Sequence, residues 1–281
     1  MKKLLLILFL SGLFIQPSLA LEKPVFFNFS LTRDEKAVKK VLNSQVRYAN
    51  KANFEKFIST FDTNYVNADG FDLDTYTKLV SDIWNTYTNI HYSLDFENIK
   101  VIDNSAEVQV IETSTAKLPL NEVYDGELYS IAYSTYYLKK INGKWKVYSD
   151  SVKDETTQML YGQAKNLDIK LTVPTSIKAG EEYTASLEFI PPEDTMAIAS
   201  IASDIVEYPQ KPTKEVFRPL PDDNILERMF TANTQDANEY IVASIGLTKA
   251  AIQDLSIKLS LTGFGYTIKR INVAKVNNDN I

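Results

Sequence analysis

One β-hairpin decides the fold of the first half of this chain, and it reads Tyr137-Leu138-Lys139-Lys140-Ile141-Asn142-Gly143-Lys144-Trp145-Lys146-Val147. The Asn-Gly pair at its centre is a strong signal for a two-residue turn between antiparallel strands. Strand-forming residues extend on both sides of the turn, over Glu127–Lys140 and Lys144–Val152. Two earlier strand patterns, at Ile90–Ile102 and Glu107–Lys117, predict that the hairpin completes an antiparallel sheet.

Helical patterns precede the sheet. Thr32 and Glu35 form a capping-box pattern, in which each side chain bonds the backbone N–H of the other residue. Apolar residues recur at helical spacing over Asp34–Asn50, and shorter helices are predicted over Asn53–Phe61 and after Asp72. Helices followed by consecutive strands are typical of an α+β fold with the helices packed on one face of the sheet.

The helix pair, the segment Tyr65-Val66-Asn67 and the hairpin together resemble the nuclear-transport-factor-2-like superfamily, which includes ketosteroid isomerase, scytalone dehydratase and the SnoaL group. The resemblance covers about half of the chain that follows residue 20. It implies an α+β cone, with helices on a bent antiparallel sheet and one open end where a ligand sits. It also implies that a homodimer forms through the sheet of the cone domain.

The second half of the chain changes character. Short strand-like runs follow one another between proline and glycine turns, which is typical of an all-β sandwich. The phrase Val173–Tyr183 resembles the opening of bacterial immunoglobulin-like domains. We therefore predict a nuclear-transport-factor-2-like domain over residues 21–161 and an immunoglobulin-like β-sandwich over 162–281. The polar stretch Lys153–Asn166 suits a boundary, so residues 21–161 are expected to fold alone.

The N-terminus has the pattern of an export signal. Lys2 and Lys3 precede the apolar run Leu4–Ile15, and Ala20 suits signal peptidase, so residues 1–20 are predicted to be a signal peptide. The apolar run is shorter than the roughly 17–25 residues of a membrane span, and no membrane insertion is expected after cleavage. An uncleaved anchor is the alternative. The mature protein is expected to be exported, either periplasmic or secreted.

Composition excludes several kinds of chemistry. The chain has no cysteine, so disulfides and thiolate sites are excluded. Loss of Lys2 and Lys3 lowers the formal net charge from −6 by two, to −8, which argues against nucleic acid or an anionic membrane surface as partner. Phosphate-loop, dinucleotide and zinc-binding spacings are missing, and neither a metal nor a cofactor is predicted.

Candidates for proton transfer are few. His91 is the only histidine, and we expect it at the end of the third helix, facing either the mouth of the cone or solvent. The resemblance implies an aspartate base just after the second helix, and Asp69 lies in that zone. Asp69-Gly70 is also an ordinary turn signal. Gln45 stands where the isomerases of the family offer a tyrosine donor, a departure that argues against isomerase chemistry.

Aromatic residues are the other candidates. Tyr129, Tyr133 and Tyr137 alternate on one face of a strand, with Tyr136 on the other face. If their face is the concave one, they line the cavity together with Tyr48, Trp84, Tyr87 and His91. The alternative is ordinary strand propensity and core packing.

These observations favour an exported, non-catalytic binding protein whose cone accepts a small apolar ligand or a peptide. Two alternatives stay open. One is an isomerase or dehydratase that uses Asp69 or His91 as its base, and the other is a purely structural module that dimerises through its sheet.

Overall fold

The fold is that of a computed structural model, which describes residues 31–87, 89–119, 125–235, 237–253 and 256–274. The predicted signal peptide over residues 1–20 and the segment 21–30 lie outside the described residues. Within them, no helix has the length and apolar character that a bilayer crossing requires.

The predicted helices form where their caps are. Thr32 and Glu35 make both hydrogen bonds of the capping box, and the side chains of Asn53 and Asp72 cap the next two helices. These predictions are confirmed, although the second helix is shorter than expected. The helices are α1 (Arg33–Ala49), α2 (Phe54–Ile58) and α3 (Leu73–Thr86).

The predicted hairpin is also confirmed. Asn142 and Gly143 have φ values of 49° and 76°, and Ile141 pairs directly with Lys144 across the turn, as the sequence signal requires. The strands of this half are β1 (His91–Ile102), β2 (Ser105–Pro119), β3 (Asp125–Ile141) and β4 (Lys144–Gly162).

The second half is built of strands after one short 3₁₀ segment. Its strands are β5 (Lys170–Thr172), β6 (Ser176–Lys178), β7 (Glu182–Glu188), β8 (Met196–Ile205), β9 (Arg218–Pro219), β10 (Ile225–Thr231), β11 (Glu239–Gln253) and β12 (Ser256–Ala274). Strand β8 was not predicted. In the sequence, the strand-like runs over residues 255–261 and 266–273 predict two separate strands; this is wrong, because Ser256–Ala274 form one continuous strand, β12.

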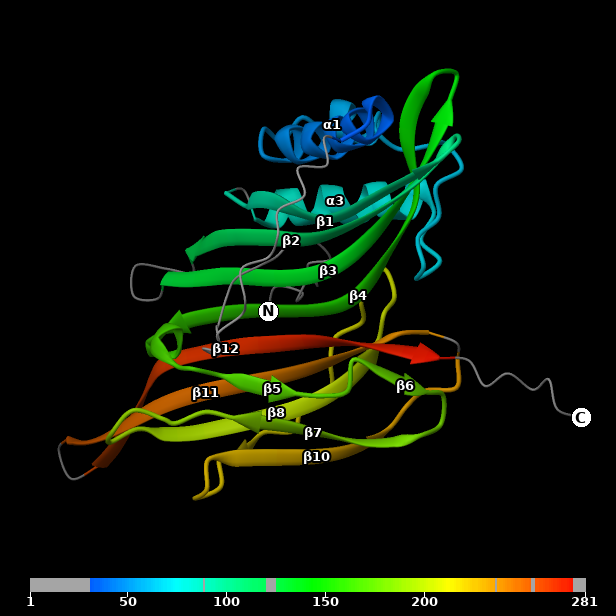
Figure 1. Ribbon diagram of the computed structural model, residues 1–281. Helices are drawn as coiled ribbons and strands as arrows, with labels where there is room; N and C mark the ends of the chain where they lie inside the picture. Colours follow the sequence, from blue (N-terminus) through cyan, green and yellow to red (C-terminus); the bar gives the residue numbers. More distant parts are fainter. Residues whose placement is uncertain (1–30, 88, 120–124, 236, 254–255, 275–281) are drawn as a thin grey trace, which may run out of the picture.

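One long sheet runs through both halves. Its order is β1-β2-β3-β4-β12-β11-β8-β9, and β5, β7 and β10 form a second, smaller sheet. Figure 1 shows α1 and α3 lying over one face of the upper part of the long sheet, and the smaller sheet lying over its lower part. The junction is the antiparallel pairing of β4 with β12, from Thr156↔Lys269 to Gly162↔Gly263.

Each half has its own apolar core. The first lies between the helices and the upper sheet, and the second lies between the two sheets, with Leu187, Ile201 and Ile241 at its centre. Tyr240 and Val242 of β11 belong to the first core. The two cores are therefore joined through the strands that they share.

The polar stretch Lys153–Asn166 is not a linker. Most of it continues β4, and Glu155 and Thr157 point into the protein, where they are at most 3% exposed. Polar residues at inward positions hid the strand alternation. Cleaving the chain here would expose the long edge of β4, so we no longer expect residues 21–161 to fold alone. The division into domains and the immunoglobulin-like assignment stay predictions.

Candidate functional site

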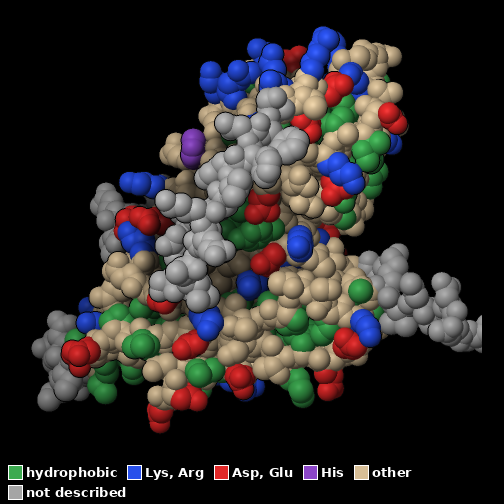
Figure 2. Space-filling view, in the orientation of Figure 1, with side chains coloured by type: hydrophobic (Ala, Val, Ile, Leu, Met, Phe, Trp, Pro, Cys, Tyr) green, Lys and Arg blue, Asp and Glu red, His purple; other side chains and the backbone are tan. Residues whose placement is uncertain are grey.

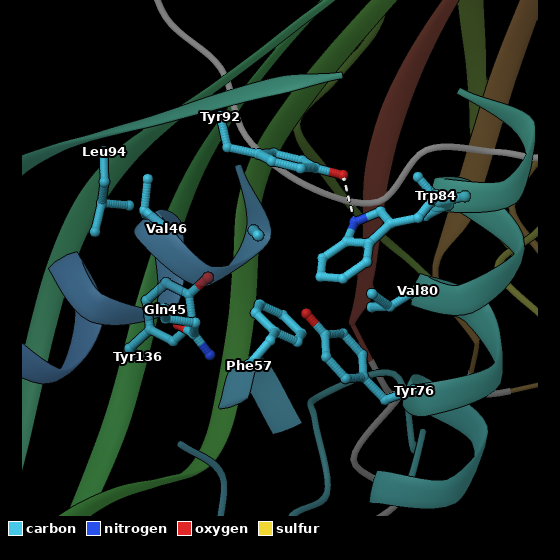
Figure 3. A pocket seen from close by; sticks show the side chains of 11 residues that line it. Gln45, Val46, Phe57, Tyr76, Val80, Trp84, Tyr92, Leu94 and Tyr136 are labelled. Carbon is cyan, nitrogen blue, oxygen red and sulfur yellow. Dashed lines mark hydrogen bonds between the residues drawn. The ribbon is translucent and has the colours of Figure 1, made fainter. Parts of the chain in front are cut away.

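Helices α1, α2 and α3 and the inner face of the sheet enclose a small apolar cavity (Figure 3). Its volume is about 30 Å³. That is enough for one or two water molecules and far below the roughly 300–1,000 Å³ of a pocket for a drug-sized ligand. Its lining side chains are mostly aromatic or aliphatic: Gln45, Val46, Ala49, Phe57, Tyr76, Val80, Ile83, Trp84, Tyr92, Leu94 and Tyr136.

Hydrogen bonds hold the polar groups of this cavity in place. The indole N–H of Trp84 donates to the hydroxyl of Tyr92 at 3.1 Å, the contact drawn in Figure 3. The side chain of Asn50 donates to the carbonyl of Tyr92 at 2.8 Å and accepts from its N–H at 2.7 Å. The amide of Gln45 donates to the hydroxyl of Thr60 at 3.2 Å. These bonds tie the end of α1 to β1 and close the wall of the cavity.

Aromatic rings fill the remaining space. Phe57 makes an edge contact with Trp84 at 5.4 Å between ring centroids and stacks on Tyr76 at 6.5 Å. Phe61 and Tyr65 continue this cluster, with their centroids 5.0 Å apart. The cone is therefore largely packed with its own side chains.

The three tyrosines predicted to line the cavity lie on the opposite face of the sheet. Burial alternates along β3, with Tyr136 inside at 4% exposure and Tyr133 outside at 37%. Tyr129 and Tyr137 share the outer face with Tyr133. The expectation was wrong because alternation separates two faces without saying which is packed. Three of the inner positions, which face the helices, carry small residues: Ser130, Ala132 and Ser134.

Of the other predicted lining residues, only Trp84 reaches the cavity. Tyr48 is half-buried, with the guanidinium of Arg47 5.2 Å from its ring centroid. Tyr87 caps the end of α3, and its hydroxyl donates to the sulfur of Met159 at 3.6 Å. His91 is exposed and begins β1 instead of ending α3. None of these three side chains faces the cavity, because each lies at the end of an element.

Asp69 also lies outside the cavity, in a buried ion pair with Arg270 of β12. The guanidinium of Arg270 donates to both carboxylate oxygens, one of them at 3.1 Å, and Asn238 donates to the same carboxylate at 2.7 Å. The side chains of Arg270 and Asp69 are 1% and 4% exposed. Asp69 therefore links the two halves of the chain and is not available as a base in the cone.

The acidic groups that do lie inside the cone are Glu112 of β2 and Asp150 of β4, at 0% and 2% exposure. Tyr136 donates to Glu112 at 3.1 Å, and Tyr65 donates to Asp150. Burial raises the pKa of Glu112 to about 8, and the negative charge of Asp150 adds to this rise. Burial likewise raises the pKa of Asp150 to about 7. Near neutral pH Glu112 therefore mostly holds its proton, whereas Asp150 is close to the midpoint of its titration.

A third buried carboxyl lies at the junction of the halves. Glu155 accepts a hydrogen bond from Tyr240 at 3.2 Å, and burial raises its pKa to about 7 although Arg270 opposes the rise. For Arg270 itself, burial works to lower the pKa, but the surrounding groups, first among them the Asp69 carboxylate, together outweigh burial and raise that pKa. Sequence reasoning missed these groups, since single polar residues at inward strand positions carry no motif.

The chemistry open to this arrangement is limited by access. The cone holds two buried carboxyls, Glu112 and Asp150, but a cavity of about 30 Å³ does not bring a substrate to them. In the described part of the chain, His, Asp and Glu side chains form no group of three or more placed to hold a metal ion.

The first half of the chain is similar to one protein-family model and to several solved structures. The family model of the C-terminal domain of the anti-sigma-I factor RsgI9 matches residues 40–159, less than half of the 281-residue chain. Solved structures with nuclear-transport-factor-2-like and cystatin-like folds match about 42–44% of the chain. No curated protein matches the chain.

Three solved structures illustrate these matches. Bd1075 of Bdellovibrio bacteriovorus is 12% identical with a TM-score of 0.36, over 43% of this chain and 42% of Bd1075, so the chain spans less than half of that protein. A cystatin-like protein of Nostoc punctiforme is 16% identical with a TM-score of 0.36, over 44% of this chain and 93% of its own. A protein of Streptomyces avermitilis, named a candidate dehydratase of the NTF2-like family, is 15% identical with a TM-score of 0.36, over 42% and 93%. Likeness at this level carries no inference about activity.

Proposed function

We propose that this chain is an exported, non-catalytic interaction protein, in which the packed cone serves as a scaffold. The observation that carries the proposal is the filled cone. Aromatic side chains leave only about 30 Å³ of cavity, and the two carboxyls in the cone, Glu112 and Asp150, are buried and hydrogen-bonded to tyrosines. A protein built to turn over a substrate needs its proton-transfer groups within reach of that substrate.

The similarity of residues 40–159 to an anti-sigma factor domain supports the same direction. That family is named for a regulatory interaction with a sigma factor and not for a reaction. By analogy, the useful surface of this chain is one that contacts another molecule.

A small apolar ligand or peptide in the cone remains part of the proposal. Such a ligand would have to displace Trp84 from its contacts with Phe57 and Tyr92, because the lining residues already fill the space. Binding would then quench or shift the fluorescence of Trp84. A homodimer through the outer face of the sheet, which carries Tyr129, Tyr133 and Tyr137, also stays a prediction. Light scattering on the purified protein measures it directly.

The test has two parts. The mass of the protein recovered from the exported fraction of its host is expected to correspond to a chain that starts at Leu21. The purified protein is then incubated with 3-oxo-steroid and hydroxynaphthalene substrates, and no turnover is expected. Turnover that is lost in Asp150→Asn, while the thermal unfolding midpoint is retained, would overturn the non-catalytic proposal.

One observation favours a second candidate, an enzyme of the isomerase or dehydratase type. Glu112 combines complete burial, a pKa raised to about 8 and a hydrogen bond from Tyr136, which lines the cavity. Strongly perturbed carboxyls of this kind concentrate at functional sites. In this reading the acid is Glu112 or Asp150, and Asp69 and His91 have no role.

A further inference from the structure

Helix α1 carries a row of cations along its solvent face. Lys36, Lys40 and Arg47 are exposed and lie four and seven residues apart, so they share one side of the helix. Lys39 lies beside them, half-buried. At about 1.5 Å per residue the row is roughly 16 Å long. Figure 2 shows Lys and Arg side chains gathered over this part of the molecule.

These cations line an open groove. The groove has a volume of about 350 Å³, and its lining residues are Lys36, Lys39, Lys40, Asn43, Ser44 and Arg47. Asn43 and Ser44 lie between the charges and offer hydrogen-bonding groups of both kinds. The groove is thus positively charged along its length and polar at its centre.

The described partners of these cations are neutral groups: Lys39 lies 4.6 Å from the ring centroid of Phe96, and Arg47 donates to the hydroxyl of Ser44 at 3.4 Å. None of the four cations of the row is in an ion pair with a described carboxylate. The acidic residues of α1 are engaged elsewhere: Asp34 pairs with Lys140 at 2.7 Å, and Glu35 closes the capping box. Like charges four residues apart repel each other on a helix. The chain nevertheless places them together, although its formal net charge is −6.

We propose that the α1 groove binds an extended acidic segment of a partner protein. The proposal rests on the interaction function proposed above and supplies its class of partner. In an extended strand, side chains on one face repeat every ~6.6–6.8 Å. Lys36 and Lys40 are separated by about 6 Å along the helix axis. Carboxylates at alternate positions of such a segment can therefore meet Lys36 and Lys40, while Asn43 and Ser44 bond its backbone and Arg47, about 10 Å farther along the axis, meets a later carboxylate.

The composition of the groove favours a peptide over a membrane or a nucleic acid. Helices that lie on membranes present an apolar face to the lipid, but Val38 and Leu42 of α1 are buried in the core at 0% exposure. Binding of single-stranded nucleic acid relies on aromatic side chains that stack with bases. The residues that line this groove include no aromatic side chain.

The experiment uses the chain without residues 1–20 and a fluorescein-labelled peptide of alternating Glu and Ser, with a Gln-Ser peptide as control. Binding is followed by fluorescence anisotropy at low and at physiological salt. The triple variant Lys36→Glu, Lys40→Glu, Arg47→Glu is expected to weaken binding by at least about tenfold, because attraction becomes repulsion. Higher salt is expected to weaken wild-type binding as well.

A matched variant distinguishes the effect of the groove residues from the effect of the change in net charge. Lys170→Glu, Lys214→Glu, Lys258→Glu changes the formal charge by the same amount at exposed positions elsewhere, and it is expected to change the affinity by less than about twofold. Circular dichroism confirms folding, and Lys40→Glu alone replaces the triple variant if that variant unfolds.

Three results would overturn the proposal: no saturable binding of the acidic peptide, equal weakening by both triple variants, or tighter groove-dependent binding of phosphatidylglycerol vesicles or an oligonucleotide. Any of them leaves the turnover assay, and with it the non-catalytic proposal, unaffected.

Discussion

The buried pair between Asp69 and Arg270 offers the sharpest test of how the two halves are joined. The two residues are 201 positions apart, and their side chains are 1% and 4% exposed. Arg270→Met removes the cation and leaves the Asp69 carboxylate with Asn238 as a donor. Breaking a buried pair on one side costs about 3–5 kcal/mol, because the remaining charge is uncompensated. We expect the free energy of unfolding to fall by that amount at pH 7.

The assay is urea unfolding followed by two probes. Both tryptophans, Trp84 and Trp145, lie in the first half, so fluorescence reports that half, whereas circular dichroism reports the whole chain. In the wild type the two transitions are expected to coincide, because one sheet runs through both halves. In Arg270→Met both midpoints are expected to fall, since each half loses a partner at the junction.

A control and a cycle complete the design. Lys78→Met breaks the ion pair of Lys78 with Asp74, whose side chains are 65% and 83% exposed, and a change too small to resolve is expected. Adding Asp69→Asn to Arg270→Met is expected to recover part of the loss, because no buried charge is then left alone. If Arg270→Met costs less than about 1 kcal/mol, the pair does not hold the junction and this reasoning is refuted.

Four further predictions follow from single features. The free energy of unfolding is expected to fall from pH 5 to pH 8. The pKa of Glu112 is raised to about 8 in the folded protein, so the folded state holds this proton more tightly than the unfolded chain, and the stabilisation is lost as the pH rises. Glu112→Gln should flatten this dependence by up to a few kcal/mol, measured by urea unfolding at each pH. Trp84→Ala should cost about 3 kcal/mol in the same assay, the low end for core tryptophan because the side chain is half-exposed. Gly143→Ala should cost ~1 kcal/mol, since φ is 76° but nothing lies within 4 Å of the added Cβ. Residues 21–161 alone should show no cooperative thermal transition by calorimetry, and a sharp transition would restore the expectation of a separable domain.

Local signals predicted the helices and the hairpin because the physical causes are local. A capping box is completed within four residues, and an Asn-Gly turn within two. The local structure can therefore be predicted from the sequence alone at Thr32 and Glu35 and at Asn142 and Gly143. The resemblance singles out Gln45 only as a departure from the donor tyrosine of the isomerases, and the structure has it among the residues that line the cavity.

The junction and the buried carboxyls could not be predicted in the same way. Asp69 precedes a glycine and has the pattern of a turn residue, and nothing near it in the sequence points to Arg270. Glu112 and Asp150 occupy inward strand positions that sequence patterns assign to apolar residues. The prediction for the outer tyrosines of β3 failed for a related reason. Large aromatic residues suggest a core face, but the inner face beside them carries the small residues Ser130, Ala132 and Ser134.

The buried ion pair and the buried carboxyl Glu112 call for different explanations. Asp69 and Arg270 satisfy each other, so their burial fixes the relative position of two distant segments with little polar capacity left over. The Oε1 oxygen of Glu112 has no well-formed hydrogen bond among the described residues, although the Ser134 hydroxyl lies close enough to lower the pKa of this carboxyl; an unsatisfied buried polar atom costs about 1–3 kcal/mol. If Glu112→Gln proves neutral or stabilising even at pH 5, where Glu112 is protonated in the folded protein, stability does not explain this carboxyl and the enzyme candidate gains support. If the substitution is destabilising at every pH, the bond from Tyr136 outweighs the cost and Glu112 is a structural group.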